Sequence, residues 1–329
     1  MTLQPQHQYN PVAPLWAYGQ TPSYNITTQY GLWSMLATKG GRLLAGANIS
    51  NGNPSLYTSV DSGATWHLAD SLNPVQVNGT PYCIKQDPVT SKVMLGCNSK
   101  QLNGLFTSTD DGKTWVNNPN NMQPIDIAFM NNKSYMTMQN GVAPVAGKYL
   151  MSSTDDFAGN WVDCTPDFTG PAFFPFRLLA DNNNLFVGGI AGNGLYKTAN
   201  PEGKSYPKTD NGITWSNPGL VWVQRLLRTG NYIFVATQDG VFRSADGGSN
   251  WTACNLGFNK AANDLAVAGT DLYVALKDSA VYKSSDNGST WTSFHNGLPV
   301  PRTVRCMQVI GNYLVEGDES SNVYRIKLQ

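Results

Sequence analysis

The chain has 329 residues, only 13% of them charged, and its 22 Lys and Arg residues balance its 22 Asp and Glu residues. A neutral chain lacks the general attraction to phosphate backbones and anionic lipids, so composition disfavours nucleic acid and membrane surfaces as partners. The 32 Gly and 19 Pro residues predict a chain dense in turns.

The first 14 residues are rich in Gln and Pro and carry neither the basic nor the apolar region of a secretory signal peptide. We expect residues 1–14 to be an N-terminal arm and residues 15–329 to form one domain. Synthesis in the cytoplasm is predicted, and the final location stays open, with a virion among the candidates. The next segment, Leu15–Tyr18, reads as an isolated strand containing Trp16.

An eight-residue pattern, Ser-x-Asp-x-Gly-x-Thr-Trp, then recurs about every 45 residues, a period that suits four-stranded propeller blades. Side chains of Asp and Ser close such a turn by bonding to backbone amides, and Gly supplies positive φ. Two eroded copies end at Trp161 and Trp215. The four best-preserved copies contain Asp61 and Trp66, Asp110 and Trp115, Asp246 and Trp251, and Asp286 and Trp291.

A short apolar strand precedes each pattern, and two further short strands precede that strand. The strands before the six patterns include residues 56–57, 105–106, 149–150, 195–196, 241–242 and 281–282, and a seventh such strand, residues 323–324, has no pattern after it. Seven such units predict an all-β, seven-bladed β-propeller with four-stranded antiparallel blades. Because the chain ends after the third strand of the seventh unit, we expect Leu15–Tyr18 to complete that blade and close the ring.

The recurring turns resemble the Asp-box, or BNR, repeats of sialidases, xyloglucan-degrading glycoside hydrolases, sortilin-type receptors and the photosystem II assembly-factor propeller. The resemblance implies that the boxes lie on outer turns between the third and fourth strands, away from the central face. It therefore implies a structural role for the box residues and leaves the function open.

No catalytic set is evident. A sialidase-type site would need three arginines, a Tyr–Glu pair and an acidic residue, together with an early Arg-Ile-Pro run that is missing here, and the chain has only Glu202, Glu316 and Glu319 as glutamates. Xyloglucanases resemble two propellers facing each other, whereas this chain predicts one. No P-loop, dinucleotide motif or CxxC pair occurs, so no cofactor and no metal are predicted.

Alignment of the units places one residue of each first strand near the propeller axis. Counting back eight residues from each second strand gives Met35, Lys85, Asp126, Arg177, Arg225, Asp264 and Cys306. Five of these seven are charged, in a chain with few charges. The ring is either a binding site for a small anionic or hydroxylated ligand or, as we favour, a set of mutually paired charges in a wet channel.

The loops that lead into the first strands offer a second candidate. Aromatic residues gather there at Phe168, Phe173, Phe174 and Trp222. They could form a surface for a glycan or a protein partner, or they could fill the gaps between blades. The insertion of about ten residues after Asn200 lies on the opposite, box-bearing face and is either a docking element or a tolerated loop.

The same alignment places Cys83 opposite Cys97 across a hairpin. Buried thiols are the favoured interpretation and a disulfide the alternative.

Three functions remain open. The favoured one is a non-catalytic interaction or assembly module, such as a tail, fibre or capsid-decorating protein of a bacteriophage, because the chain has low charge, many Asn, Gly and Thr residues and no catalytic set. The alternatives are a lectin-like glycan-binding propeller and a glycoside hydrolase that uses Asp126 or Asp264.

Overall fold

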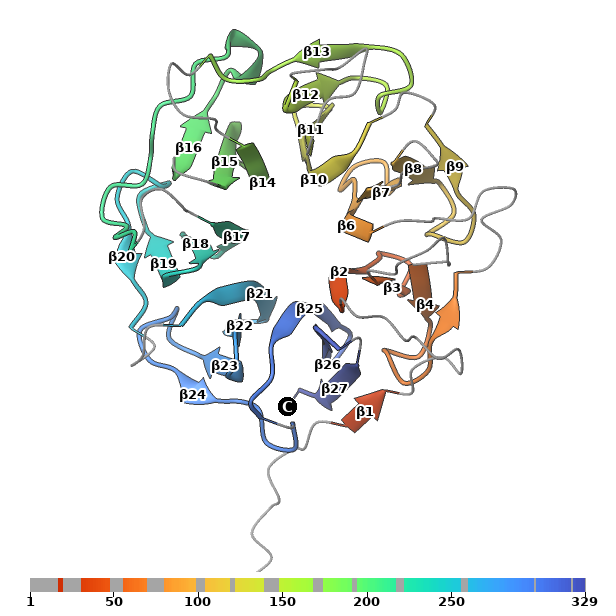
Figure 1. Cartoon of the computed structure of the whole chain (residues 1–329), viewed down its shortest axis with the longest axis vertical. Helices are drawn as coiled ribbons and strands as arrows, with labels where there is room; N and C mark the ends of the chain where they lie inside the picture. Colours follow the sequence, from red (N-terminus) through yellow and green to blue (C-terminus); the bar gives the residue numbers. More distant parts are fainter. Residues whose placement is uncertain are drawn as a thin grey trace, which may run out of the picture.

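The computed structural model describes residues 17–19, 31–47, 56–69, 80–98, 104–118, 122–138, 148–167, 174–190, 194–216, 222–255, 260–298, 300–320 and 322–328. Seven antiparallel sheets surround a central axis, as Figure 1 shows. The predicted all-β, seven-bladed β-propeller is therefore confirmed. Among the described residues, no helix is long and apolar enough to cross a membrane.

The blades follow one another in chain order, and in each the first strand lies innermost (Figure 1). The innermost strands are β2 (Leu32–Ala37), β6 (Thr80–Gln86), β10 (Pro124–Met130), β14 (Phe174–Asp181), β17 (Val223–Thr229), β21 (Ala262–Ala268) and β25 (Val304–Ile310). The second strands are β3 (Leu43–Ala47), β7 (Val93–Asn98), β11 (Lys133–Met138), β15 (Asn184–Ile190), β18 (Tyr232–Thr237), β22 (Asp271–Leu276) and β26 (Tyr313–Asp318).

The third strands are β4 (Leu56–Ser59), β8 (Leu105–Ser108), β12 (Leu150–Ser153), β16 (Leu195–Thr198), β19 (Gly240–Ser244), β23 (Ala280–Ser284) and β27 (Val323–Lys327). The outer strands are short, with two or three residue pairs each. They are β5 (His67–Leu68), β9 (Val116–Asn117), β13 (Trp161–Asp163), β20 (Thr252–Ala253), β24 (Thr292–Ser293) and, in the last blade, β1 (Ala17–Gly19).

Strand β1 closes the ring. It pairs antiparallel with β27, with Ala17 opposite Arg325 and Gly19 opposite Val323. The predicted exchange of strands between the two ends of the chain is confirmed over these three residues, while Leu15 and Trp16 lie outside the described residues. Strand β1 thereby covers the edge of β27 that would otherwise be unpaired and completes the four strands of the last blade.

The recurring turns connect the third and outer strands by the hydrogen bonds that their residue types predict. In the first blade the amide of Gly63 donates to Ser59 Oγ over 2.9 Å, and the amide of Thr65 donates to an Asp61 carboxylate oxygen over 2.9 Å. Burial raises the pKa of Asp61, but these bonds and those from the Thr65 and Ser59 hydroxyls lower it to about 2. The same bonds recur at Asp110, Asp246 and Asp286.

The fourth blade departs from the expected pattern. Its described sheet has three strands, and the outer position is taken by residues 207–209, where Lys208 forms an isolated bridge with Tyr196 and the amide of Thr209 donates to Leu195 O over 2.8 Å. The eroded copy that ends at Trp215 was expected between the third and outer strands. It comes after the outer segment instead, because the insertion, with the 3-10 turn η1 (Pro201–Gly203), makes that connection.

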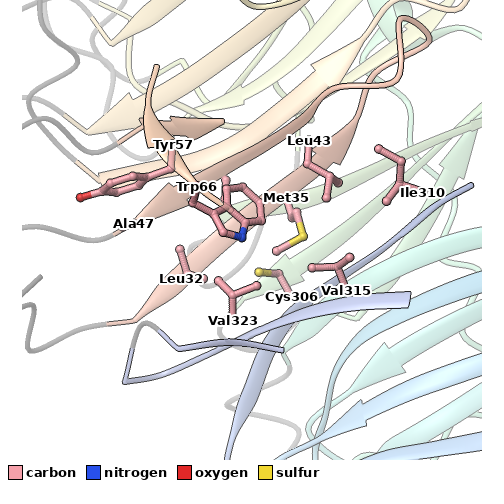
Figure 2. Close-up of a cluster of buried hydrophobic side chains, with 11 residues drawn as sticks. Leu32, Met35, Leu43, Ala47, Tyr57, Trp66, Cys306, Ile310, Val315 and Val323 are labelled. Carbon is pink, nitrogen blue, oxygen red and sulfur yellow. The ribbon is translucent and has the colours of Figure 1, made fainter. Parts of the chain in front are cut away.

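Packing between blades supplies the core. Seven apolar clusters are found among the described residues, one at each contact between neighbouring blades. Figure 2 shows the cluster between the first and last blades, where Trp66, Met35 and Leu43 face Cys306 and Val315. Each sheet therefore covers its two apolar faces with its two neighbours.

The cysteines are buried free thiols, as favoured from the sequence. The expected pairing of Cys83 opposite Cys97 is wrong, since Cys83 lies opposite Gly96 and Cys97 lies opposite Pro81. A β-bulge between Pro81 and Cys83 shifts the register. The two thiols then fall in different apolar clusters.

One buried acid interrupts this apolar packing. Glu316 in β26 is fully buried, whereas the positions aligned with it in the other second strands are Ala45, Leu95, Met136, Val187, Val235 and Val274. Arg302 Nη2 lies 2.9 Å from Glu316 Oε1 but donates its hydrogen bond to Asp318 Oδ2 over 2.8 Å. Burial raises the pKa of Glu316 to about 8. The charge of Asp318 also raises this pKa, whereas the charge of Arg302 lowers it.

This raised pKa predicts a stability change with pH. The folded chain holds the Glu316 proton above the ordinary pKa of a glutamate, so the associated stability is complete below about pH 4.5 and is lost as the pH rises to about 8. Glu316→Gln cannot ionise. Its free energy of unfolding should exceed that of the wild type by a few kcal/mol at about pH 9 and by much less at about pH 5, measured by urea denaturation. An equal difference at both pH values would contradict the prediction.

Candidate functional site

The innermost strands bring their charged residues to one end of the axis. Each of these strands carries a β-bulge near its start. The residues directly after the bulges occupy equivalent places around the axis, and they are Ser34, Cys83, Asp126, Arg177, Arg225, Asp264 and Cys306.

Five of the seven expected ring positions therefore hold, and two are wrong. In the first two blades the equivalent residues are Ser34 and Cys83, not Met35 and Lys85. Counting back from the second strand fails there because the hairpins are longer: Gln86 pairs with Val93, whereas Met130 pairs with Lys133 in the third blade. Lys85 still reaches the ring through its long side chain, since its Nζ lies 2.9 Å from Asp126 Oδ1.

The two acidic residues of the ring join neighbouring blades. Asp126 Oδ2 accepts a hydrogen bond from the amide of Leu178 over 2.9 Å, and Asp264 Oδ2 accepts one from the amide of Met307 over 2.7 Å. In each case the acceptor and the donor lie in consecutive blades. These carboxylates therefore hold innermost strands together at the axis, a structural role that the sequence did not reveal.

The charge of Asp126 is stabilised by its surroundings. Burial raises its pKa, but the charges of Lys85 and Arg177 and the amide of Leu178 outweigh burial, so the pKa lies below the ordinary value. The carboxylate is thus ionised at neutral pH and already bonded. Such a group is poorly suited to act as a catalytic acid.

The arginines of the ring are less completely paired. Arg225 Nε lies 3.4 Å from Asp264 Oδ1 but forms no hydrogen bond within the described residues. Arg177 donates from Nε to Gln224 O over 2.7 Å, and no carboxylate of the described residues lies within ion-pair distance of it. Burial lowers the pKa of Arg177 and the neighbouring Arg225 adds to this effect, whereas Asp126 opposes it.

The ring encloses a small axial cavity. Its volume is about 50 Å³, room for a few water molecules or one carboxylate-sized group but not for a sugar ring. Four cationic residues, Lys85, Arg177, Arg225 and Arg305, line it against two acidic ones, Asp126 and Asp264. The wall of the cavity therefore has two more cationic than acidic side chains, and one of the cations, Arg305, pairs with Glu319 outside the wall, with 3.6 Å between Nη2 and Oε2.

Aromatic rings surround this cavity, in part at positions that the sequence did not suggest. Trp33 and Tyr82 line it and pack edge to face with centroids 5.8 Å apart, and Arg305 lies 5.6 Å from the Trp33 ring centroid. Trp33, Tyr82 and Arg305 are the bulge residues just before the ring positions. A shift of one residue from the expected positions reaches Arg305 alone, because Trp33 and Tyr82 lie two and three residues before Met35 and Lys85 in the blades with longer hairpins.

The expected aromatic surface is seen only in part. Phe174 packs against Tyr149, and Trp222, which is 38% exposed, packs edge to face on Phe176. Phe168 and Phe173 lie outside the described residues. Arg177 lies 4.2 Å from the Phe176 ring centroid, so this aromatic group adjoins the ring.

No group of His, Cys, Asp and Glu in the described part of the chain could hold a metal ion.

The fold defines the chain as a seven-bladed β-propeller, and comparison with known proteins supports this class. No family model and no curated protein sequence matches the chain. Solved structures do match, among them YCF48 bound to a D1 peptide, with 16% identity, a TM-score of 0.68, and coverage of 98% of this chain and 96% of that one.

Two enzymes share the fold at similar distance. An inactive virginiamycin B lyase from Staphylococcus aureus with quinupristin is 12% identical, with a TM-score of 0.68, and the match covers 95% of this chain and 100% of that one. The xyloglucanase of Xanthomonas campestris is 14% identical, with a TM-score of 0.59, and 92% of this chain covers 43% of that one. Likeness at this level establishes the fold alone.

The bonds of Asp126 predict a large effect on stability. Asp126→Ala leaves the Leu178 amide and Lys85 without their partner, so the free energy of unfolding should fall by about 3 kcal/mol. Urea denaturation at neutral pH checks this. Asp167→Ala, at an exposed acidic residue, should change stability little, and equal effects of both substitutions would contradict the assigned role.

Proposed function

We propose that the chain is a non-catalytic protein-interaction module that binds an acidic segment of a partner at the axial mouth. The observation that carries the proposal is the uneven pairing of charge there. Asp126 and Asp264 are bonded to backbone amides of neighbouring blades, while Arg177 has no carboxylate partner in the described part of the chain. A carboxylate from outside would complete the pairing.

The rings around the mouth support the same proposal. Trp33, Tyr82 and Trp222 offer partly exposed aromatic faces beside the cations. Aromatic residues and Arg dominate the energetics of protein interfaces. In the YCF48 structure that shares this fold, the bound molecule is a peptide.

At the axis, the alternatives that the sequence left open receive less support. The axial cavity is too small for a sugar ring, and the two axial carboxylates that a glycoside hydrolase would use are engaged in bonds between blades. Release of sugar from sialyl or glucan substrates, lost on Asp126→Ala or Asp264→Ala, would nevertheless overturn the non-catalytic assignment.

Two narrower assignments accompany the proposal. The hydrogen bonds of the four intact turns support their classification as Asp-box repeats. The low charge and the turn-rich composition favour a structural component of a larger assembly, such as a bacteriophage particle. Mass spectrometry of purified particles tests this second assignment.

The axial mouth is tested by peptide binding. On an array of short peptides, the full-length chain should retain acidic peptides, and fluorescence polarisation should show about tenfold weaker binding for Arg225→Ala, the cost of one charge-assisted hydrogen bond. Arg228→Ala is the matched control. It lies on the same strand but pairs with Asp181 through a 2.8 Å contact.

Binding by Arg228→Ala should equal that of the wild type. Retention of peptides without regard to acidic residues, or equal loss in both variants, would contradict the proposal.

A further inference from the structure

The turn of the third blade is one residue longer than the intact turns and lacks their glycine. Phe157 occupies the glycine position, because its amide donates to Ser153 Oγ over 2.8 Å as the Gly63 amide does to Ser59 Oγ. Its φ is 65°, in the left-handed region that a bulky side chain rarely adopts. This strained residue must therefore be held by its surroundings.

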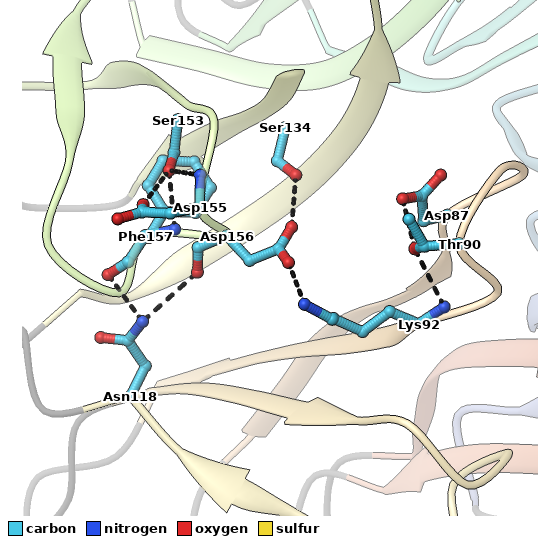
Figure 3. Close-up of polar contacts among 9 residues, drawn as sticks. All are labelled: Asp87, Thr90, Lys92, Asn118, Ser134, Ser153, Asp155, Asp156 and Phe157. Atoms are coloured by element: carbon cyan, nitrogen blue, oxygen red, sulfur yellow. Dashed lines mark hydrogen bonds and ion pairs between the residues drawn. The ribbon is translucent and has the colours of Figure 1, made fainter. Parts of the chain in front are cut away.

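Contacts from two blades hold it. Asn118 Nδ2 of the second blade donates to Phe157 O over 2.7 Å, and Ser134 Oγ donates to Asp156 over 3.0 Å, while Lys92 also pairs with Asp156 (Figure 3). The Phe157 ring is fully buried between the second and third blades. Five methionines surround this region, and their flexible side chains accommodate an unusual ring: Met94, Met122, Met136, Met138 and Met151.

Phe157 thereby takes the place that a turn tryptophan fills elsewhere. Trp66, Trp115 and Trp251 are buried between blades, and each donates its indole N–H to the turn glycine carbonyl. Trp161 is only partly buried, and its indole N–H has no acceptor among the described residues. Trp291, in an intact turn, is also only partly buried and its Nε1 lacks an acceptor in the described part of the chain, but that atom is shielded from solvent. The Trp161 indole instead borders a pocket.

This indole lines a rim pocket of about 270 Å³, which is also lined by Lys133, Ser152, Thr154, Asn160 and Glu202. The far wall comes from the insertion of the fourth blade. Glu202 in η1 pairs with Lys133 and accepts a hydrogen bond from Ser152 Oγ over 3.0 Å. The two departures from the repeat, the longer turn and the insertion, therefore meet at one pocket.

We propose that this rim pocket binds a neutral saccharide residue, a function separate from the axial mouth. A sugar ring presents one face of C–H groups, which suits an aromatic surface, and an edge of hydroxyls, which need both donors and acceptors. Trp161 supplies the surface, and Thr154, Asn160 and Glu202 supply polar atoms. The charges of Lys133 and Glu202 cancel, which favours a neutral ligand over an ion.

Indole NMR signals of the ¹⁵N-tryptophan-labelled full-length chain test the proposal. The probes are the methyl glycosides of glucose, galactose, mannose, xylose and N-acetylglucosamine. At least one should shift the Trp161 signal, assigned with Trp161→Phe, and leave the other indole signals in place. On a glycan array, Trp161→Ala should lose the binding of the wild type.

Two further variants distinguish a specific loss of sugar binding from a general loss of folding. Trp215→Ala removes another partly exposed tryptophan, whose N–H bonds to Asp210, and should bind as the wild type does. Phe157→Gly combined with deletion of Ala158 restores the spacing of the intact turns; it should fold, bury Trp161 and lose sugar binding.

Three results would each overturn the proposal. They are no shift of the Trp161 signal with any probe, an equal loss of binding in Trp161→Ala and Trp215→Ala, and undiminished binding by the repaired turn. None of them bears on the axial mouth.

Discussion

The structure depends on one constraint: every sheet has two apolar faces, and only its neighbours in the ring can cover them. The seven apolar clusters lie at the seven contacts between blades, so no blade has a core of its own. The ring must therefore close, and pairing of β1 with β27 achieves this by joining the two ends of the chain in one sheet. Stability is then a property of the whole ring.

Closure also decides what happens at the axis. Innermost strands of seven blades meet there, and their bulges turn charged side chains into a confined space, where an unpaired charge is costly. The carboxylates of Asp126 and Asp264 are stabilised there by hydrogen bonds that they accept from backbone amides of the next blade. The same arrangement leaves Arg177 without a carboxylate partner among the described residues, and this is the basis for the acidic-peptide binding that we propose at the axial mouth.

The repeats made the fold predictable, because period, turn residues and apolar strands all agree. The residues of the axial ring were predictable except where the hairpin length varies, as at Lys85. The bulges that bring Trp33 and Arg305 to the cavity could not be predicted, because no residue pattern within a repeat marks a bulge. The burial of Glu316 was not predicted from the sequence, and its contact with Arg302 depends on how the loop before β25 folds. The role of Phe157 at the glycine position of its turn could not be predicted, because it depends on contacts with the second blade that are distant in the sequence.

We propose that the axial mouth receives a carboxylate of a partner. The most direct measurement is a crystal structure of the chain grown with a short oligoglutamate peptide. We expect a peptide carboxylate between Arg177 and Arg225, with Asp126 and Asp264 still bonded to the neighbouring blades. Peptide bound elsewhere on the surface, with water alone between the two arginines, would contradict it.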